Sequence, residues 1–282
     1  MNSSVLFSVI IPTYHRNDLL TKCLDCLAVE VQTLPAQYEV IVSDDGSETT
    51  AEEMIREHYP WAKWVAGPRK GPAANRNNGA KYAQGEWLVF TDDDCLPEPN
   101  WLSAFAEATT GSALALEGAI HPLGNSDQDL AECPINVTGG YFWSANIAVQ
   151  RSLFEKIGGF NPNYPLAAHE DQDLQLRLSP LTTILFVPEA GVYHPVRLLT
   201  LKEAITRIPK RCAAWAYHVS TNRQALGYES NLSIILADYK FQLITLRRSL
   251  KELHFKRSCV AITMLIAGIP ITWRYLLRNN VT

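Results

Sequence analysis

The sequence predicts an α/β protein with a doubly wound, mostly parallel sheet and a helical region appended at the C-terminus. Three observations lead to this fold class. Short apolar runs alternate with segments of helical spacing over the first two thirds of the chain. Polar clusters follow directly after several of these runs, where doubly wound sheets bind their ligands. The last third is basic and helix-like in composition.

Length and charge divide the chain in two. The 282 residues are 47% hydrophobic, enough for one large α/β domain with an appendage and too apolar for general disorder. Residues 1–196 hold 11 Lys and Arg against 25 Asp and Glu, whereas residues 197–282 hold 14 against 4. We therefore expect one acidic domain over 1–196 and a basic, mainly helical region over 197–282.

The first half contains four expected strands with helices between them. Residues 5–11 form a short, nearly continuous apolar run that is rich in β-branched residues, which is typical of a strand buried on both faces. A helix with apolar spacing follows from Asp18. The next helix is expected to be capped by Thr49 or Thr50, and a third opens at Gly71 and ends near Gly85. Strands are expected at residues 5–11, 39–43, 64–66 and 86–90.

The second half continues the alternation less regularly. Three further helices are expected from the spacing of apolar residues. One begins at Trp101, a short one ends at Gly158, and one begins at Glu170. Residues 121–140 are polar and contain Gly and Pro, so we expect a loop there. Strands are expected at residues 113–120, 141–149 and 183–187.

Three consecutive acids, Asp92, Asp93 and Asp94, come directly after the fourth strand. Carboxylates this close raise one another's pKa and repel. A divalent cation with oxygen ligands removes that cost. The ordinary alternative is a solvated acidic turn. Further polar clusters follow other strands and favour the cation site, because such ends lie at one edge of the sheet.

The six cysteines indicate no disulfide framework. Cys23 and Cys26 form a C-x-x-C, which fits one face of a helix better than a redox pair or half of a zinc site. A reducing compartment fits this usage. The first residues lack the basic segment of a secretory signal, so we expect a cytoplasmic protein.

Together these clusters resemble the family 2 glycosyltransferases, which have the GT-A fold. The resemblance extends from Phe7 to Pro195, most of the chain, and each motif alone is weak. The motifs, in the family's order, are SVIIPTYHR (8–16), SDDGS (43–47), GPAANRNNGA (71–80), FTDDDC (90–95), NIAVQRSLFEKIGGF (146–160) and EDQDLQLRL (170–178).

The resemblance implies a nucleotide-sugar donor and a bound Mn²⁺ or Mg²⁺. Asp94 would reach the metal directly, Asp92 or Asp93 would meet the ribose or the metal's waters, and Asp92 and His194 would complete the metal site. A strand-end histidine without a ligand is the ordinary alternative for His194. The donor's base, ribose and diphosphate would be bound by Pro12, Thr13, Tyr14, Arg16, Asp44, Asp45 and Arg76.

Two of these residues favour a UDP-sugar, because Asp45 or Asp44 can accept a hydrogen bond from the uracil imide N–H. The alternative is that this pair only forms a turn and a helix cap. Arg76 would reach the base or the diphosphate; otherwise it lies on a solvated helix face.

The acceptor hydroxyl must lose a proton as it attacks, and a carboxylate is the simplest general base. The resemblance assigns this role to Asp171, with inversion of the anomeric centre. Glu170 would orient the acceptor, although acids in a first helical turn also stabilise the helix dipole. Asn146 and Trp143 would line the acceptor side, whereas Phe142 is expected in the core.

The C-terminal region is expected to associate with a membrane. Residues 258–273 carry no charge, but a full span needs about 20 apolar residues. The neighbouring basic residues favour an anionic leaflet. The alternatives are a helical cap on the core and an oligomer interface. Membrane association would suit a lipid-linked acceptor or a growing surface glycan, with the protein at the cytoplasmic face.

Two other functions remain open from the residues alone. A sugar-nucleotide pyrophosphorylase shares a similar fold, but residues 12–17 lack the Gly-rich, basic loop expected after its first strand. A non-catalytic nucleotide-sugar-binding protein is disfavoured because all the expected acids are present. We expect no nucleic-acid partner.

Overall fold

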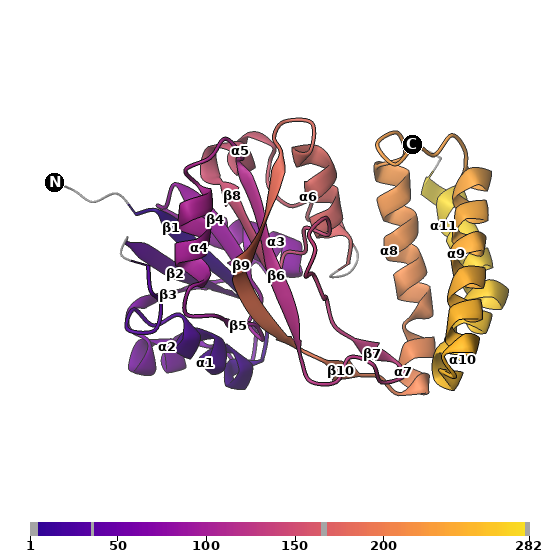
Figure 1. Ribbon diagram of the computed structural model, residues 1–282, viewed down its shortest axis with the longest axis horizontal. Coiled ribbons are helices and arrows are strands. Elements are labelled where there is room, and N and C mark those ends of the chain that lie inside the picture. Colours follow the sequence, from indigo (N-terminus) through magenta and orange to yellow (C-terminus); the bar gives the residue numbers. More distant parts are fainter. Residues whose placement is uncertain (1–4, 35–36, 165–167, 280–282) are drawn as a thin grey trace. The chain divides into compact units, whose positions relative to one another are not determined.

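The computed structural model describes residues 5–34, 37–164 and 168–279 (Figure 1). They form two compact units. Unit 1 comprises Met1–Leu123, Pro134–Pro162 and Glu170–Pro195. Unit 2 comprises Gly124–Cys133, Asn163–His169 and Val196–Thr282. Unit 2 thus contains two short segments that the sequence-based division assigned to the first domain.

Unit 1 contains an eight-stranded mixed sheet of order β3-β2-β1-β4-β8-β6-β9-β5. Strands β3, β2, β1 and β4 are parallel, β8 is antiparallel to both of its neighbours, β6 and β9 are parallel, and β5 is antiparallel to β9. The expected mostly parallel α/β fold is confirmed. The bounds are β1 Phe7–Thr13, β2 Tyr38–Asp44, β3 Ala62–Ala66, β4 Trp87–Thr91, β5 Leu96–Pro97, β6 Ala115–Leu123, β8 Asn146–Gln150 and β9 Ile184–Pro195.

Side chains of the central strands alternate between two apolar cores, because successive residues of a strand point to opposite faces. Val9 and Ile11 of β1 belong to one core and Ile10 to the other. The first core also contains Leu20 from a helix, and the second contains Ala73 from another. The helices of unit 1 are α1 Asn17–Cys26, α2 Glu52–His58, α3 Pro72–Ala80, α4 Trp101–Ala108, α5 Arg151–Lys156 and α6 Glu170–Leu178.

Several elements differ from the sequence-based expectation. The loop expected over 121–140 contains the end of β6, at Leu123, and the short strand β7 Ala131–Glu132. The strand expected over 141–149 begins only at Asn146, because the backbone before it turns and Phe142 has a φ of 50°. No threonine side chain caps α2; instead the backbone N–H of Ala51 donates to Asp44 Oδ2 at 2.6 Å. Strand β9 is much longer than residues 183–187, so His194 lies within a strand.

Unit 2 is mainly helical, as expected for the C-terminal region. It also holds a two-stranded sheet of β7 Ala131–Glu132 and β10 Arg197–Leu198. Its helices are α7 Leu201–Thr206, α8 Ile208–Thr221, α9 Asn231–Lys251, α10 Phe255–Thr263, the π-helix η1 Met264–Gly268 and α11 Ile269–Asn279. Among the described residues, one helical stretch, Phe255–Arg278, has the length and apolar composition needed to cross a bilayer, with a mean hydropathy of 1.6.

Candidate active site

The three acids after β4 meet two basic side chains. Asp93 is fully buried and accepts hydrogen bonds from Thr13 Oγ1 at 2.7 Å and Arg16 Nε at 3.2 Å. Burial raises the pKa of Asp93 to about 7, although Arg16 and Thr13 oppose the shift. Arg16 also donates to Asp94 Oδ2 at 2.9 Å. The sequence placed Arg16 near the nucleotide base; in the structure its guanidinium holds two of the three acids.

Asp94 and His194 form the part of this cluster that fits a metal ion. Asp94 Oδ1 lies 3.5 Å from His194 Nε2 and, although buried, accepts no hydrogen bond from the described residues. Together with Cys95, their possible ligand atoms lie within 4.8 Å of one another. Burial raises the pKa of the Cys95 thiol well above its usual range, so it stays protonated. Hard cations prefer oxygen and imidazole donors to a thiol, which makes Asp94 and His194 the fitting pair.

Arg76 joins the acids after β4 to those that open α6. Its Nη2 lies 2.6 Å from Asp92 Oδ1 and its Nη1 lies 3.1 Å from Glu170 Oε1. The Arg76 side chain is only 5% exposed, so it is not on a solvated helix face. Burial alone would raise the pKa of Asp92, but Arg76 and His194 bring it below its usual value. The Asp92 side chain is 24% exposed, which leaves room for a ligand beside the ion pair.

Asp171 lies in the first turn of α6, next to this network. Its Oδ2 accepts the Ser144 backbone N–H at 3.3 Å and its Oδ1 accepts that of Gln172 at 2.8 Å. Burial raises the pKa of Asp171, and Arg76 partly opposes the shift. Burial and the neighbouring Asp171 raise the pKa of Glu170 to about 7. The structure therefore brings Asp171, Glu170, Arg76 and Asp92 into one cluster.

The residues expected to bind the nucleotide base lie at the ends of β1 and β2. Pro12 and Thr13 are buried in β1, whereas Tyr14 is 59% exposed. Asp44 accepts N–H groups from Gly46, Ala51 and Trp64, at 2.8, 2.6 and 3.2 Å. Its carboxylate therefore serves the turn and the helix start, the alternative that the sequence left open.

Asp45 has a different set of partners. Its two oxygens accept the backbone N–H groups of Arg69 and Gly71 at 2.8 and 3.1 Å. Burial raises the pKa of Asp45, and these hydrogen bonds oppose the shift. Asp45 thus supports the loop that leads into α3.

Asn146 corrects one expectation for the acceptor side. It is 1% exposed, its Nδ2 donates to the carbonyls of Ala119 and Ala190 at 2.8 Å each, and its Oδ1 accepts from Trp101 Nε1 at 2.8 Å. The amide is thus used by the core and does not face a substrate. Trp143 is partly buried, with its ring 4.8 Å from that of Tyr141, and the core position of Phe142 is confirmed.

Glu117 is a residue that the sequence-based reasoning missed. It lies in β6, is 3% exposed, and accepts the backbone N–H groups of Gly140, Tyr141 and Phe142 at 2.5, 3.2 and 2.9 Å. The same loop carries the Ser144 N–H that donates to Asp171. A lone glutamate inside the apolar run 113–120 is the signal that marked this position.

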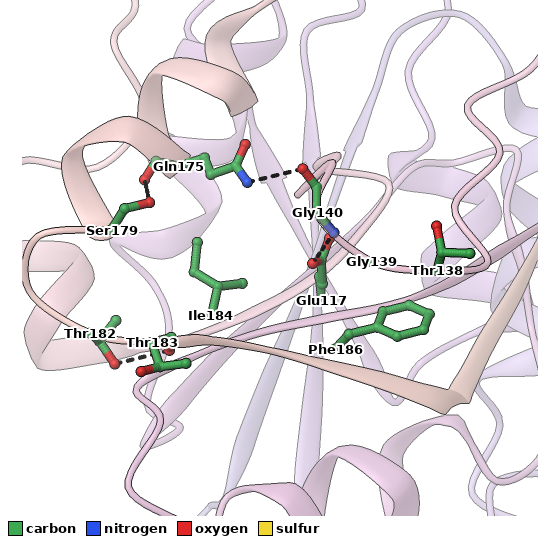
Figure 2. Close-up of a pocket in the computed structure, with 10 residues that line it drawn as sticks. All are labelled: Glu117, Thr138, Gly139, Gly140, Gln175, Ser179, Thr182, Thr183, Ile184 and Phe186. Carbon is green, nitrogen blue, oxygen red and sulfur yellow. Dashed lines mark hydrogen bonds between the residues drawn. The ribbon is translucent and has the colours of Figure 1, made fainter. Parts of the chain in front are cut away.

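Beside Glu117 lies an open cavity of about 530 Å³ (Figure 2). Its wall includes Phe186 of β9 and Gln175 of α6, whose Nε2 donates to the Gly140 carbonyl at 3.3 Å. The lining contains none of the acids after β4 and neither Glu170 nor Asp171. The first turn of helix α6 therefore belongs to the acidic cluster, whereas its C-terminal half lines this separate cavity.

Comparison with solved structures shows the fold class of unit 1 and its helical appendage. The chain superposes on a mannosyltransferase from Pyrobaculum calidifontis, solved with GDP-Man and Mn²⁺, with a TM-score of 0.56 at 16% identity, over 99% of this chain and 74% of that one. It also resembles S. aureus TarS 1–349 in complex with UDP, with a TM-score of 0.55 at 18% identity, over 98% and 91% of the two chains. This is the GT-A type of α/β fold.

The sequence comparison agrees with the fold. The model of the family described as Glycosyl transferase family 2 matches residues 8–115, so this part of the chain is similar to that family. A validoxylamine A glucosyltransferase from Streptomyces hygroscopicus subsp. limoneus is 28% identical over 218 residues, which cover 61% of this chain. The match covers 48% of that relative, so the chain spans about half of its length.

Proposed function

We propose that this protein is an inverting glycosyltransferase that moves a sugar from a nucleotide-diphosphate sugar to an acceptor hydroxyl. The observation that carries the proposal is the Arg76 bridge between Asp92 and Glu170. It unites the acids after β4, where a donor diphosphate and a cation would bind, with Asp171, which would act on the acceptor. In this proposal the residues that would bind the donor and the residue that would activate the acceptor belong to one cluster.

A divalent cation, Mn²⁺ or Mg²⁺, fits Asp94 and His194. The support is the buried Asp94 Oδ1, which lacks a hydrogen-bond donor among the described residues, and the imidazole 3.5 Å away. Asp92 would contribute through its partly exposed carboxylate. When bound, the cation would neutralise the charge that develops on the diphosphate leaving group. Of the two solved relatives above, the Pyrobaculum mannosyltransferase binds Mn²⁺.

Asp171 is the proposed general base. Its two backbone N–H partners hold the carboxylate in place, and burial raises its pKa, which makes it a better proton acceptor near neutral pH than an ordinary aspartate. It would take the proton from the acceptor hydroxyl while that oxygen attacks the anomeric carbon. Direct displacement from the face opposite the diphosphate inverts that carbon.

Glu170 and Arg76 would assist without taking the proton. Glu170 Oε2 and Arg76 Nε are buried and lack hydrogen-bond partners among the described residues. Unpaired buried polar atoms are costly, and a bound sugar or phosphate supplies the missing partners. Glu170 would therefore orient a sugar hydroxyl, and Arg76 would contact the donor.

For the donor we favour a UDP-sugar. Asp45 can accept the uracil imide N–H, since two backbone N–H groups leave part of its acceptor capacity unused. Exposed Tyr14 offers a ring to the base. The TarS structure holds UDP, whereas the Pyrobaculum enzyme holds GDP-Man. The acceptor would be a glycan or a lipid-linked sugar in cell-surface polysaccharide or glycolipid synthesis.

The test is sugar transfer and donor binding by Asp171→Asn. Screening nucleotide sugars by thermal shift, with and without Mn²⁺, first identifies the donor. The variant should bind that donor like the wild type but transfer sugar at least about 100-fold more slowly, because a general base contributes that much or more. Glu155→Gln, at an exposed site on α5, is the matched control and should keep full activity. Unchanged turnover by Asp171→Asn would refute the assignment.

A further inference from the structure

Helices α9, α10 and α11 of unit 2 bury several small and polar residues, in contrast to the pattern that water favours. Of the four buried residues of α9, three are polar: Asp238, Gln242 and Ser249. Helices α10 and α11 contact α9, and from α10 to α11 the buried side chains are Ser258, Ala261, Gly268, Thr272 and Leu276. A surface helix in water buries its large apolar side chains. Small and polar residues between helices are typical of helices in contact with lipid.

Most of the large apolar side chains of these helices point outward, with Ile234 and Leu276 as buried exceptions. On α9 six of them recur at intervals of four and three residues, which places these six along one side of the helix, whereas the exposed Phe241 and Ile244 lie outside this row. We call this row the outer stripe; it consists of Leu232, Leu236, Tyr239, Leu243, Leu246 and Leu250. Leu236 and Leu250 are each 59% exposed. On the segment from α10 to α11, Phe255 is 76% and Ile266 is 72% exposed.

The charges next to the outer stripe indicate what covers it. Exposed Lys240, Arg247 and Lys251 each follow a stripe residue directly and form a basic row beside it. The only acid on α9, Asp238, is on the buried side. A second copy of the chain would place like charges against each other and gain no ion pairs. An anionic surface complements the basic row. Residues 197–282 contain 14 basic and 4 acidic residues, and this net positive charge also favours binding to an anionic surface.

We propose that unit 2 binds the surface of an anionic lipid bilayer, with the outer stripe of α9 and the outward apolar residues of α10–α11 against the acyl chains. The basic row then lies at the level of the lipid phosphates. The cytoplasmic leaflet, which carries anionic lipids, is the natural partner. This binding needs no nucleotide sugar, so it is measured independently of sugar transfer.

The experiment is co-sedimentation of the purified full chain with vesicles. Vesicles of phosphatidylcholine mixed with phosphatidylglycerol should bind the protein, and pure phosphatidylcholine vesicles should bind it far more weakly. Lys240→Gln/Arg247→Gln should bind the anionic vesicles about 30-fold more weakly, since each basic side chain near such a surface contributes roughly fivefold. Leu236→Ser/Leu250→Ser should lose binding to the anionic vesicles, because it lacks two apolar side chains that contact the acyl chains. These four side chains are exposed, so the variants should fold.

Matched controls lie in unit 1. Lys22→Gln/Arg56→Gln removes two exposed charges and Val29→Ser/Leu181→Ser removes two exposed apolar side chains; both should bind vesicles like the wild type. Failure of the wild type to bind anionic vesicles at low salt would overturn the proposal, as would equal binding to both vesicle types. A dimer in solution that Leu236→Ser/Leu250→Ser dissociates, with vesicle binding unchanged, would assign the stripe to a second copy instead.

Discussion

Replacing Arg76 by methionine tests the network on which the candidate site depends. Methionine fills much of the same space but leaves Asp92 and Glu170 without their shared cation. Removing one partner of a buried ion pair costs about 3–5 kcal/mol, because the other charge stays buried and uncompensated. We assign most of this loss to Glu170, whose side chain is 4% exposed, and less to the more accessible Asp92.

The size of this loss depends on pH. The pKa of Glu170 is about 7 in the folded protein, against 4.5 for an ordinary glutamate. The folded protein binds this proton more tightly than the unfolded chain, so the contribution of Glu170 to stability falls as pH rises from 4.5 to about 7. Without Arg76 the pKa of Glu170 rises further, and the fall continues to higher pH. The variant should therefore be least destabilised near about pH 5, where only the smaller share from Asp92 remains, and most destabilised near about pH 8.

Urea unfolding followed by circular dichroism at the two pH values measures the effect. Arg56→Met is the control, since its partner Glu53 is 3.6 Å away and both side chains are well exposed; it should lose less than about 1 kcal/mol. Adding Glu170→Gln to Arg76→Met should recover part of the stability at high pH, because the buried charge is gone. A loss for Arg76→Met that is equal at both pH values, or no larger than the control, would refute the reasoning.

Two further predictions concern the metal and the loop before β8. Asp94→Ala should lose the Mn²⁺-dependent part of donor binding, measured by calorimetry with and without Mn²⁺, while its circular dichroism spectrum is unchanged; retained metal dependence would remove Asp94 from the metal site. Glu117→Gln replaces a carboxylate that accepts three backbone N–H groups with a side chain that has one acceptor oxygen. Glu117→Gln should lower kcat for transfer by about tenfold or more and leave donor affinity unchanged, because the loop would no longer hold Ser144 against Asp171. The magnitude follows from hydrogen bonds to a charged group, which contribute about 1.5–3 kcal/mol each. An unchanged kcat would show that the loop does not position the base.

Much of the sheet and of the acidic site follows from local pattern. The runs at 5–11 and 86–90 are apolar at every position but one, and strands buried on both faces require such a composition. The acids that follow the strands at 39–43 and 86–90 lie at the carboxyl edge because parallel strands share one direction. The start of α6 at Glu170 likewise follows from its first-turn acids and helical spacing.

Other assignments depended on contacts between residues distant in sequence. The sequence around Asn146 fits a substrate ligand and a core residue equally well. Its hydrogen bonds to residues of β6, β9 and α4 show that the side chain belongs to the core. The strand expected over 141–149 is shortened because Glu117 draws the backbone N–H groups of the preceding loop away from the sheet. The extension of β9 to Pro195 depends on its pairing with β6.

The sequence by itself determined the α/β class, the position of each acidic cluster and the basic, apolar character of the last third. These properties depend on residue type and periodicity, which are local. The tertiary structure decided which charges meet: Arg76 with Glu170 across 94 positions, Arg16 with Asp94 across 78, and Asp94 with His194. It also decided that α9 turns its leucines outward. Chain folding brings these groups together, and the energy of a charge or an apolar side chain depends on what surrounds it.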